Sequence, residues 1–318
     1  MLLSVEELKT YCYSQDKTIR AVDGATFSIK KGEILSLVGE SGCGKTLTAL
    51  SITRLMPSRA CRITAGQVVF NEQDLLNCKE KELINIRGRD ISYIFQEPAT
   101  ALNPVMRVGE QIKEAIVTHR KEKDAFAYTV ELLELMGIDR AKERYYAYPH
   151  QLSGGMKQRV MIAMAISTSP QLLIADEPTT ALDVTVQAQI LQLLKKLQKE
   201  KDLSMLFITH DLAVASQISD QICVMYAGEI VEKAGIKEFL KSPKHPYSQD
   251  LLKCIPKLRA QQERLKSIKG RVEERLADYQ YCRYTTRCDF EFARCRKENV
   301  QMIDTGENHG VKCFRYYK

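Results

Sequence analysis

The chain has 318 residues, of which 44% are hydrophobic and 27% are charged, a composition typical of a folded globular protein rather than a disordered or fibrous one. No apolar run reaches the roughly 18 residues needed to span a bilayer. The N-terminal residues include Glu6 and Glu7 and lack the basic start of a signal peptide. We therefore expect a cytosolic protein unless a partner holds it at a membrane.

The net charge of +7 is concentrated near the C-terminus. Residues 256–318 contain 15 Lys and Arg against 9 Asp and Glu, so they carry +6 and the preceding 255 residues carry only +1. A nearly neutral body with a basic tail argues against a groove that binds nucleic acid. Four of the ten cysteines also lie in the last 37 residues. In a cytosolic chain, such a group favours a metal site over disulfides.

The predicted elements alternate between strands and helices. In chain order we expect strands at Ile19–Val22 and Ala25–Ile29 with an Asp23–Gly24 turn between them, a buried strand at Glu33–Val38, a helix from Gly44 to Arg54, and a strand at Ile91–Phe95. From Glu97 to Ala165 the spacing is mostly helical. Further strands are expected at Leu172–Ala175, Leu203–Ile208 and Ile222–Tyr226, with a helix at Val184–Leu197. These patterns predict an α/β core with a helical insertion, followed by a polar linker or amphipathic helix near Leu258–Leu276.

The segment GESGCGKT, Gly39–Thr46, follows the buried strand and precedes the helix. It fits the phosphate-loop pattern G-x-x-x-x-G-K-[ST], in which glycines let backbone N–H groups turn toward phosphate oxygens at a helix N-terminus. Lys45 would bridge the β- and γ-phosphates, and the Thr46 hydroxyl would bind Mg²⁺. The nucleotide-binding residues predicted in this loop are Gly39, Ser41, Gly42, Cys43, Gly44, Lys45 and Thr46.

The segment LLIADEP, Leu172–Pro178, is an apolar strand that ends in two carboxylates. In a parallel sheet, the carboxyl end of a buried strand faces the ligand crevice. Asp176 would therefore hold Mg²⁺, and Glu177 could polarise the attacking water as a general base.

The segment LSGGMKQR, Leu152–Arg159, places Ser153 at a helix N-cap, and its two glycines allow close approach of a backbone. Together with the phosphate loop, this segment resembles the signature of the ATP-binding cassette ATPases. GESGCGKT then resembles their Walker A motif and LLIADE their Walker B motif. Gln96 in IFQEP resembles the Q-loop residue, Thr180–Asp183 the D-loop, and His210 in ITHD the switch histidine.

This resemblance implies a P-loop nucleotide-binding domain with a RecA-like core, an antiparallel β subdomain and a helical subdomain. It also implies a head-to-tail dimer in which ATP lies between the Walker A loop of one subunit and the signature of the other. Gln96 would sense Mg²⁺ and the γ-phosphate, and His210 would help to place the water. An aromatic residue near the first strands, Tyr13 or Tyr11, should stack on adenine. The further cofactor-binding residues that the resemblance implies are Ser153, Gly154, Gly155, Gln158 and Asp183.

The finer resemblance is to the peptide/nickel importers, in particular the oligopeptide and dipeptide permease ATP-binding subunits. The stretches that carry it are AVDG, LNPVMRVGEQI, YPHQLSGGM, DEPTTALDVTVQAQIL, VMYAGEIVE and HPYSQDLL. It implies ATP hydrolysis that drives uptake of di- or oligopeptides, with nickel or another solute as the alternative. The implied partners are two membrane permease subunits, a second ATPase subunit (a related chain or a copy) and, indirectly, an extracellular solute-binding protein. We expect the chain at the cytoplasmic face of the membrane, with Pro98–Ile112 facing a permease helix and no nucleic acid bound.

Two other functions are less well supported by the sequence. A soluble cassette protein that acts on nucleic acid or ribosomes typically has two cassettes or long coiled-coil insertions, and this chain has neither. A regulatory cassette without hydrolysis is disfavoured, because the chain keeps the residues that hydrolysis needs, namely Lys45, Ser153, Asp176, Glu177 and His210.

The four C-terminal cysteines, Cys282, Cys288, Cys295 and Cys313, have the spacing C-x₅-C-x₆-C-x₁₇-C. Four thiolates suit Zn²⁺ or an iron–sulfur cluster, and the absence of a C-x₂₋₄-C pair favours the cluster. The tail is also similar to the C-terminal extension of the peptide-permease ATPases, which implies a 4Fe-4S cluster. Zinc and free thiols remain the alternatives.

The expected organisation is an ATPase domain at 1–255, with a helical subdomain at about 97–165, and a Cys-rich extension at 256–318. His309 is expected to pack rather than to bind metal. The arginines expected to offset the negative charge of a cluster are Arg283, Arg287, Arg294 and Arg296.

Overall fold

The computed structural model of the chain describes residues 1–14, 17–120, 122–180, 182–254, 268–270, 281–306 and 308–317. The chain forms two compact units. Unit 1 contains Met1–Ile29, Ile34–Leu76 and Thr209–Lys318, and unit 2 contains Lys30–Glu33 and Asn77–Ile208. The linker expected near Leu258–Leu276 lies outside the described residues except for 268–270.

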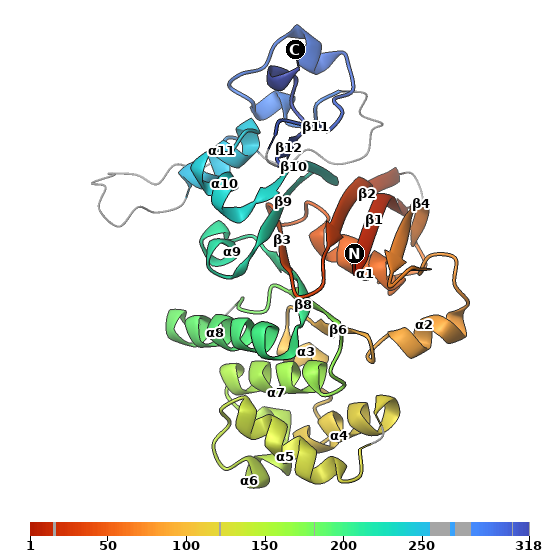
Figure 1. Ribbon diagram of the computed structural model, residues 1–318, viewed down its shortest axis with the longest axis vertical. Coiled ribbons are helices and arrows are strands. Elements are labelled where there is room, and N and C mark those ends of the chain that lie inside the picture. Colours follow the sequence, from red (N-terminus) through yellow and green to blue (C-terminus); the bar gives the residue numbers. More distant parts are fainter. Residues whose placement is uncertain are drawn as a thin grey trace. The chain divides into compact units, whose positions relative to one another are not determined.

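Unit 1 begins with a four-stranded antiparallel sheet (Figure 1). Its strands, in spatial order, are β2 (Lys17–Ile29), β1 (Leu3–Ser14), β4 (Cys61–Phe70) and β5 (Gln73–Asp74). The prediction of a turn at Asp23–Gly24 is wrong, because β2 continues through these residues. Instead, the register between β1 and β2 shifts here, and Glu7 and Gly24 have φ of 46° and 87°. Such a bulge bends a strand without ending it.

The second strand group of unit 1 surrounds the phosphate-loop segment. Strand β3 (Ile34–Val38), buried at every residue, runs parallel to β9 (Gln221–Tyr226), which forms a hairpin with β10 (Glu229–Gly235). The C-terminal strands β12 (Gly310–Val311) and β11 (Ile303–Asp304) extend this group from the edge of β10. The helices of unit 1 are α1 (Lys45–Ile52), α9 (Leu212–Ile218), α10 (Ile236–Lys241) and α11 (Pro246–Lys253).

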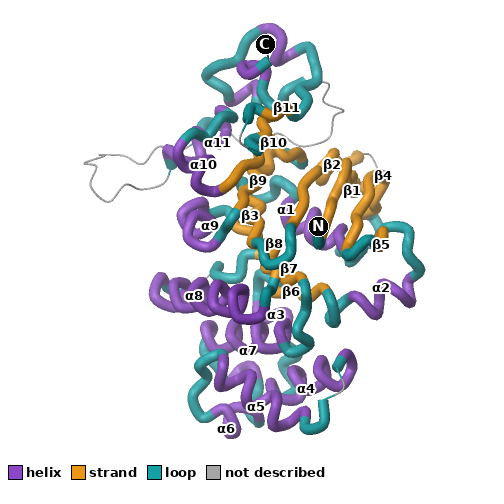
Figure 2. The backbone as a smooth tube through the Cα atoms, in the orientation of Figure 1, coloured by secondary structure: helices purple, strands orange, loops and turns teal. Residues whose placement is uncertain are grey.

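Unit 2 contains three parallel strands and most of the helices (Figure 2). The strands are β6 (Ile91–Ile94), β7 (Leu172–Asp176) and β8 (Ser204–Thr209, whose last residue belongs to unit 1), and α8 (Val184–Lys201) connects β7 to β8. The remaining helices are α2 (Glu80–Ile86), α3 (Pro98–Ala101), α4 (Val108–His119), α5 (Ala125–Leu135), α6 (Ala141–Tyr145), the 3₁₀ turn Pro149–Gln151 and α7 (Gly154–Ile166). Parallel strands joined by helices confirm the predicted α/β class, and helices occupy most of the stretch between Glu97 and Ala165. In the described residues, no helix has the length and apolar character required to cross a membrane.

The C-terminal segment 281–317 has little regular structure of its own. It contains three 3₁₀ turns, Thr285–Arg287, Ala293–Arg296 and Phe314–Tyr316. Tyr284 is buried against Tyr226 of β9 and Tyr247 of α11, with ring centroids 5.1 and 5.3 Å away. A second small core contains Cys295, Val300 and Phe314. The segment is therefore held by packing against the rest of unit 1 rather than by a large core of its own.

Candidate functional site

The phosphate loop lies between β3 and α1, as the sequence predicts. Gly42 and Gly44 have φ of 78° and 112°, a region that side chains other than glycine rarely adopt. Gly44 occupies the N-cap of α1 and provides no side-chain cap, so the first N–H groups of the helix have no side-chain acceptor there. A helix N-terminus with this geometry suits a phosphate group. Ser41, Gly42 and Thr46 are exposed, whereas Cys43 and Lys45 are buried.

Lys45 is tied to its own loop. Its ammonium donates to the carbonyl oxygens of Gly39 (2.8 Å) and Glu40 (3.0 Å). Gly39 has no room for a side chain, because a Cβ there would lie 2.2 Å from the carbonyl oxygen of Met225. The Cys43 carbonyl accepts from the N–H of Gly228 at 2.8 Å. Strand β9 and the turn after it therefore pack directly against the phosphate loop.

The C-terminal part of unit 1 also contacts this loop, at Glu40. The main-chain N–H of Glu40 donates to the hydroxyl of Tyr247 at 2.9 Å. Arg287 donates to both carboxylate oxygens of Glu40, from Nη1 at 2.7 Å and from Nη2 at 3.0 Å. Burial by itself lowers the pKa of Arg287, but hydrogen bonds to Glu40 and Tyr226 outweigh it and raise that pKa overall. The guanidinium is therefore a permanent cation beside the loop.

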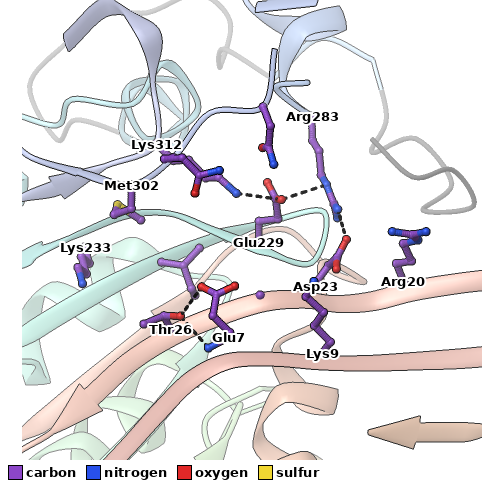
Figure 3. Close-up of a pocket in the computed structure, with 14 residues that line it drawn as sticks. Glu7, Lys9, Arg20, Asp23, Thr26, Glu229, Lys233, Arg283, Met302 and Lys312 are labelled. Atoms are coloured by element: carbon purple, nitrogen blue, oxygen red, sulfur yellow. Dashed lines mark hydrogen bonds and ion pairs between the residues drawn. The ribbon is translucent and has the colours of Figure 1, made fainter. Parts of the chain in front are cut away.

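A second arginine connects the C-terminal segment to the antiparallel sheet (Figure 3). Arg283 pairs with Asp23 of β2, and its Nε lies 3.5 Å from Glu229, which also pairs with Lys312 at 2.9 Å. Burial opposes ionisation of Asp23, but the hydrogen bond from Tyr11 and the charge of Arg283 lower its pKa overall. Asp23, Glu229, Arg283 and Lys312 line a polar cavity of about 430 Å³. The network joins β2, the β9–β10 hairpin and the C-terminal segment.

The two candidate adenine-stacking residues differ in their surroundings. The Tyr11 hydroxyl donates to Asp23 at 2.7 Å, and the guanidinium of Arg20 lies 5.3 Å from the centre of its ring. Tyr13, near the end of β1, is 43% exposed. Tyr11 therefore has partners on its ring and its hydroxyl, whereas the side chain of Tyr13 is partly open to solvent.

In unit 2, three of the predicted site residues lie at or just after the ends of β6 and β7. Asp176 is the last residue of the strand and is buried. Glu177 follows with φ of 47°, and its carboxylate accepts from Gln96 Nε2 at 3.2 Å and from Thr180 Oγ1 at 2.9 Å. The structure therefore brings Gln96, Glu177 and the first D-loop residue together. Both hydrogen bonds reach the same oxygen, Oε2, of the Glu177 carboxylate.

The remaining predicted residues lie at helix starts. Ser153 caps α7 and accepts from the N–H of Met156 at 3.3 Å, and Asp183 caps α8 in the same way at 2.9 Å. Ser153 and Gly154 are exposed, but Gln158 is only 2% exposed, on the buried side of α7. His210, in unit 1, is exposed and directly precedes Asp211, the N-cap of α9.

The four C-terminal cysteines line one cavity, together with His245, Thr285 and Phe314. Burial raises the pKa of Cys282 and of Cys288 to about 11 and also raises that of Cys313. Among the described residues, however, no group of three or more His, Cys, Asp or Glu side chains is arranged to hold a metal ion. The thiols thus share a cavity without forming a metal-binding group.

The neighbouring charged residues correct one expectation. The arginines expected to offset a cluster instead bind carboxylates: Arg283 binds Asp23, Arg287 binds Glu40, Arg294 binds Glu298 and Arg296 binds Glu291. His309 is fully buried, and its Nε2 lies 2.6 Å from the Glu232 carboxylate, in agreement with a packing role. Glu232 also accepts the N–H groups of Lys244 and His245.

Sequence reasoning missed two features of unit 1. Cys12 and Cys61 face each other across β1 and β4 and form a disulfide, although the sequence places both among the scattered cysteines of the body. Sequence reasoning also gave no role to Glu40 or Tyr247, and it expected Arg287 to offset the charge of a cluster rather than to bind Glu40. Tyr247 belongs to HPYSQDLL and Arg287 precedes Cys288, so the only available signal was membership of stretches that resemble the permease subunits.

Comparison with known families agrees with the motifs. The family described as ABC transporter matches residues 22–180, and the family described as oligopeptide/dipeptide transporter, C-terminal region, matches residues 231–295. The second match includes α11 and the first three cysteines of the C-terminal group.

Similar proteins cover nearly the whole chain. The oligopeptide transport ATP-binding protein AppD of Bacillus subtilis is 45% identical, over 99% of this chain and 97% of its own length. The dipeptide transport ATP-binding protein DppD of Haemophilus influenzae is 44% identical, over 98% of this chain and 94% of its own. Among solved structures, a dimeric post-hydrolysis state of the ATP-binding cassette MJ0796 bound to ADP and Pi has a TM-score of 0.66 and 28% identity, and covers 74% of this chain and 98% of its own.

Proposed function

The chain belongs to the ABC transporter ATPases and carries the C-terminal region of the oligopeptide/dipeptide transporters, and from this premise we propose that it is the ATP-hydrolysing subunit of an importer for di- or oligopeptides. The observation that carries the proposal is similarity along nearly the entire chain to transport ATP-binding proteins, C-terminal region included. The match to the transporter C-terminal region therefore favours a transporter subunit over a soluble cassette that acts on nucleic acid.

Each nucleotide-site residue then has a role. Lys45 would neutralise the β- and γ-phosphates, and the exposed Thr46 hydroxyl and the Asp176 carboxylate are the groups that we propose as Mg²⁺ ligands. Mg²⁺ supplies charge neutralisation of the phosphates when it is bound. Glu177 accepts the proton of the attacking water, and Gln96, which donates to Glu177, links that carboxylate to the segment that follows β6. His210 helps to orient the water, and Tyr13 stacks on adenine.

The signature residues act on a second subunit. Ser153, Gly154 and Gly155 would contact the nucleotide of a partner ATPase, which is a related chain or a copy of this one, and Asp183 would act at the same interface. Gln158 supports α7 from the buried side rather than touching nucleotide, since its side chain is 2% exposed. The other partners are two membrane permease subunits and a solute-binding protein, which places the chain peripherally at the cytoplasmic face of the membrane. The segment Pro98–Ile112 would meet the permease.

The C-terminal cysteines would hold a metal group within the extension 256–318, which follows an ATPase domain at 1–255. Four soft sulfur donors that line one cavity suit a 4Fe-4S cluster, with zinc as the alternative. Because the four thiols do not form a metal-binding group as they lie, binding would require them to rearrange. The test is iron, sulfide and zinc analysis of anaerobically purified protein. Protein that contains one zinc ion and no iron would show a zinc site in place of the cluster. Protein without either metal would exclude both.

Reconstitution with the permease subunits tests the main proposal. Proteoliposomes that contain the complex should take up a labelled dipeptide only when ATP is present on the side of this subunit. Lys45→Ala should abolish nucleotide binding, hydrolysis and uptake together, because the charge that offsets the phosphates is lost. ATP-dependent uptake of nickel but not of peptide would show that nickel, and not peptide, is the substrate. Nucleotide binding by Lys45→Ala would contradict the assigned role of the loop.

A further inference from the structure

Glu40 is the residue of the phosphate loop at which three independent contacts meet. Its carbonyl oxygen accepts from the Lys45 ammonium at 3.0 Å. Its N–H donates to Tyr247, and its carboxylate accepts two hydrogen bonds from Arg287. Glu40, which accepts from Lys45, is thus itself held by the C-terminal part of the chain.

Arg287 has little freedom to move away from this contact. Its side chain is 3% exposed, and its Nε donates to the carbonyl oxygen of Lys269 at 2.7 Å. The guanidinium also lies 5.7 Å from the ring centre of Tyr226 and 5.8 Å from that of Tyr284. A planar, two-pronged contact held in this way fixes direction as well as charge, which a flexible surface ion pair cannot do.

The contact has two physical consequences for a nucleotide on the loop. First, a loop already held in place loses less conformational entropy when it closes around phosphates. Second, the Glu40 carboxylate is a negative charge in a loop that must receive a polyanion. Arg287 offsets that charge, so its removal leaves both a looser loop and an unpaired carboxylate near the phosphates.

We propose that Arg287, with Tyr247, positions the phosphate loop for nucleotide binding, so that the C-terminal segment is a working part of the ATP site. Arg287 is a positioning residue, because it acts through Glu40 and does not touch the nucleotide. The inference rests on the proposed function in one respect, namely that nucleotide binds to Gly39–Thr46.

Calorimetric titration of the full chain with Mg²⁺–ADP tests the proposal without hydrolysis. Arg287→Gln should raise the dissociation constant about tenfold, which corresponds to about 1.4 kcal/mol. Arg287→Lys keeps the charge but loses the two-pronged geometry, so its dissociation constant should lie between those of the wild type and Arg287→Gln. Arg296→Gln is the matched control, because this arginine of the same segment is 61% exposed and pairs with Glu291. It should bind ADP like the wild type.

A double-substitution cycle separates positioning from general damage. The variant Glu40→Gln/Arg287→Gln removes the unpaired carboxylate, so it should bind ADP no more weakly than Arg287→Gln alone. In ATP hydrolysis, Arg287→Gln should raise KM more than it lowers kcat. Wild-type affinity for ADP in both Arg287 variants would overturn the proposal. So would a double variant that binds ADP more weakly than Arg287→Gln alone. If Arg287→Gln does not fold, Arg287→Lys and its double variant with Glu40→Gln carry the same test. Loss of binding in Lys45→Ala beside unchanged binding in the Arg287 variants would refute this inference alone and leave the proposed function standing.

Discussion

Replacement of Arg283 by methionine should destabilise unit 1 strongly. The Arg283 side chain is 4% exposed and pairs with Asp23, whose side chain is 9% exposed, while its Nη1 donates to the carbonyl oxygen of Ala227 at 2.5 Å. Removal of one partner of a buried ion pair costs about 3–5 kcal/mol, because it leaves the other charge uncompensated. Tyr11 still donates to Asp23, and Lys312 still pairs with Glu229, so we expect the lower end, about 3 kcal/mol.

Urea unfolding of the full chain at constant pH measures this loss. The matched control is Arg296→Met, whose exposed ion pair with Glu291 is screened by solvent, so its loss should change the stability little. The double variant Asp23→Asn/Arg283→Met removes the stranded charge and should recover part of the lost stability. Equal, small losses in Arg283→Met and Arg296→Met would refute the reasoning, as would a double variant less stable than Arg283→Met.

Three further results are expected. Glu177→Gln should lower ATP hydrolysis by about 10²- to 10⁴-fold, because it removes the proton acceptor, with nucleotide affinity nearly unchanged in a binding titration; near-normal turnover would remove Glu177 from this role. Tyr13→Ala should weaken ATP binding about tenfold through lost stacking, whereas Tyr11→Phe should not, and the reverse ranking would reassign the adenine contact. Burial lowers the pKa of His245 to about 4, below its ordinary 6.5. Between these values the unfolded chain binds a proton that the folded chain does not, so the free energy of unfolding should fall by about 2 kcal/mol from pH 7.5 to pH 5. A smaller fall in His245→Asn, measured by urea unfolding at both pH values, would identify this group as the cause.

The sequence predicted the parts of the site that depend on local order. The phosphate loop needs a buried strand, glycines at fixed positions and a following helix, and all three lie within about twenty residues. Likewise, a run of apolar residues that ends in Asp176 and Glu177 places both at the carboxyl end of a parallel strand. In each case the residues that make the geometry are neighbours in the chain.

Contacts between distant residues could not be predicted in the same way. Arg287 and Glu40 are 247 positions apart, and no periodicity relates them. The Cys12–Cys61 pair depends on the register between β1 and β4. Strand β4 was not predicted, because half of its residues are exposed, including the unbroken run 64–67. The Asp23–Gly24 turn signal was overridden by strand pairing, which absorbs the irregularity as a bulge.

The arrangement of the C-terminal segment leads to one last prediction. Arg283 and Arg287, which grip the rest of unit 1, each adjoin a cysteine of the shared cavity, Cys282 and Cys288. A change in that cavity therefore reaches Glu40 through the short 3₁₀ turn that carries Arg287. We expect Cys288→Ser to weaken Mg²⁺–ADP binding in the wild type.

The same substitution should add little in the Arg287→Gln background, because the link to the phosphate loop is already absent there. Cys254→Ser is the control, since this partly buried thiol does not line the cavity. The measurement is the ADP dissociation constant of the four variants of the cycle, with metal content determined for each. If Cys288→Ser weakens ADP binding by the same factor with and without Arg287→Gln, Cys288 acts on the nucleotide site by another route. Unchanged affinity in Cys288→Ser would show that the cavity and the phosphate loop are independent.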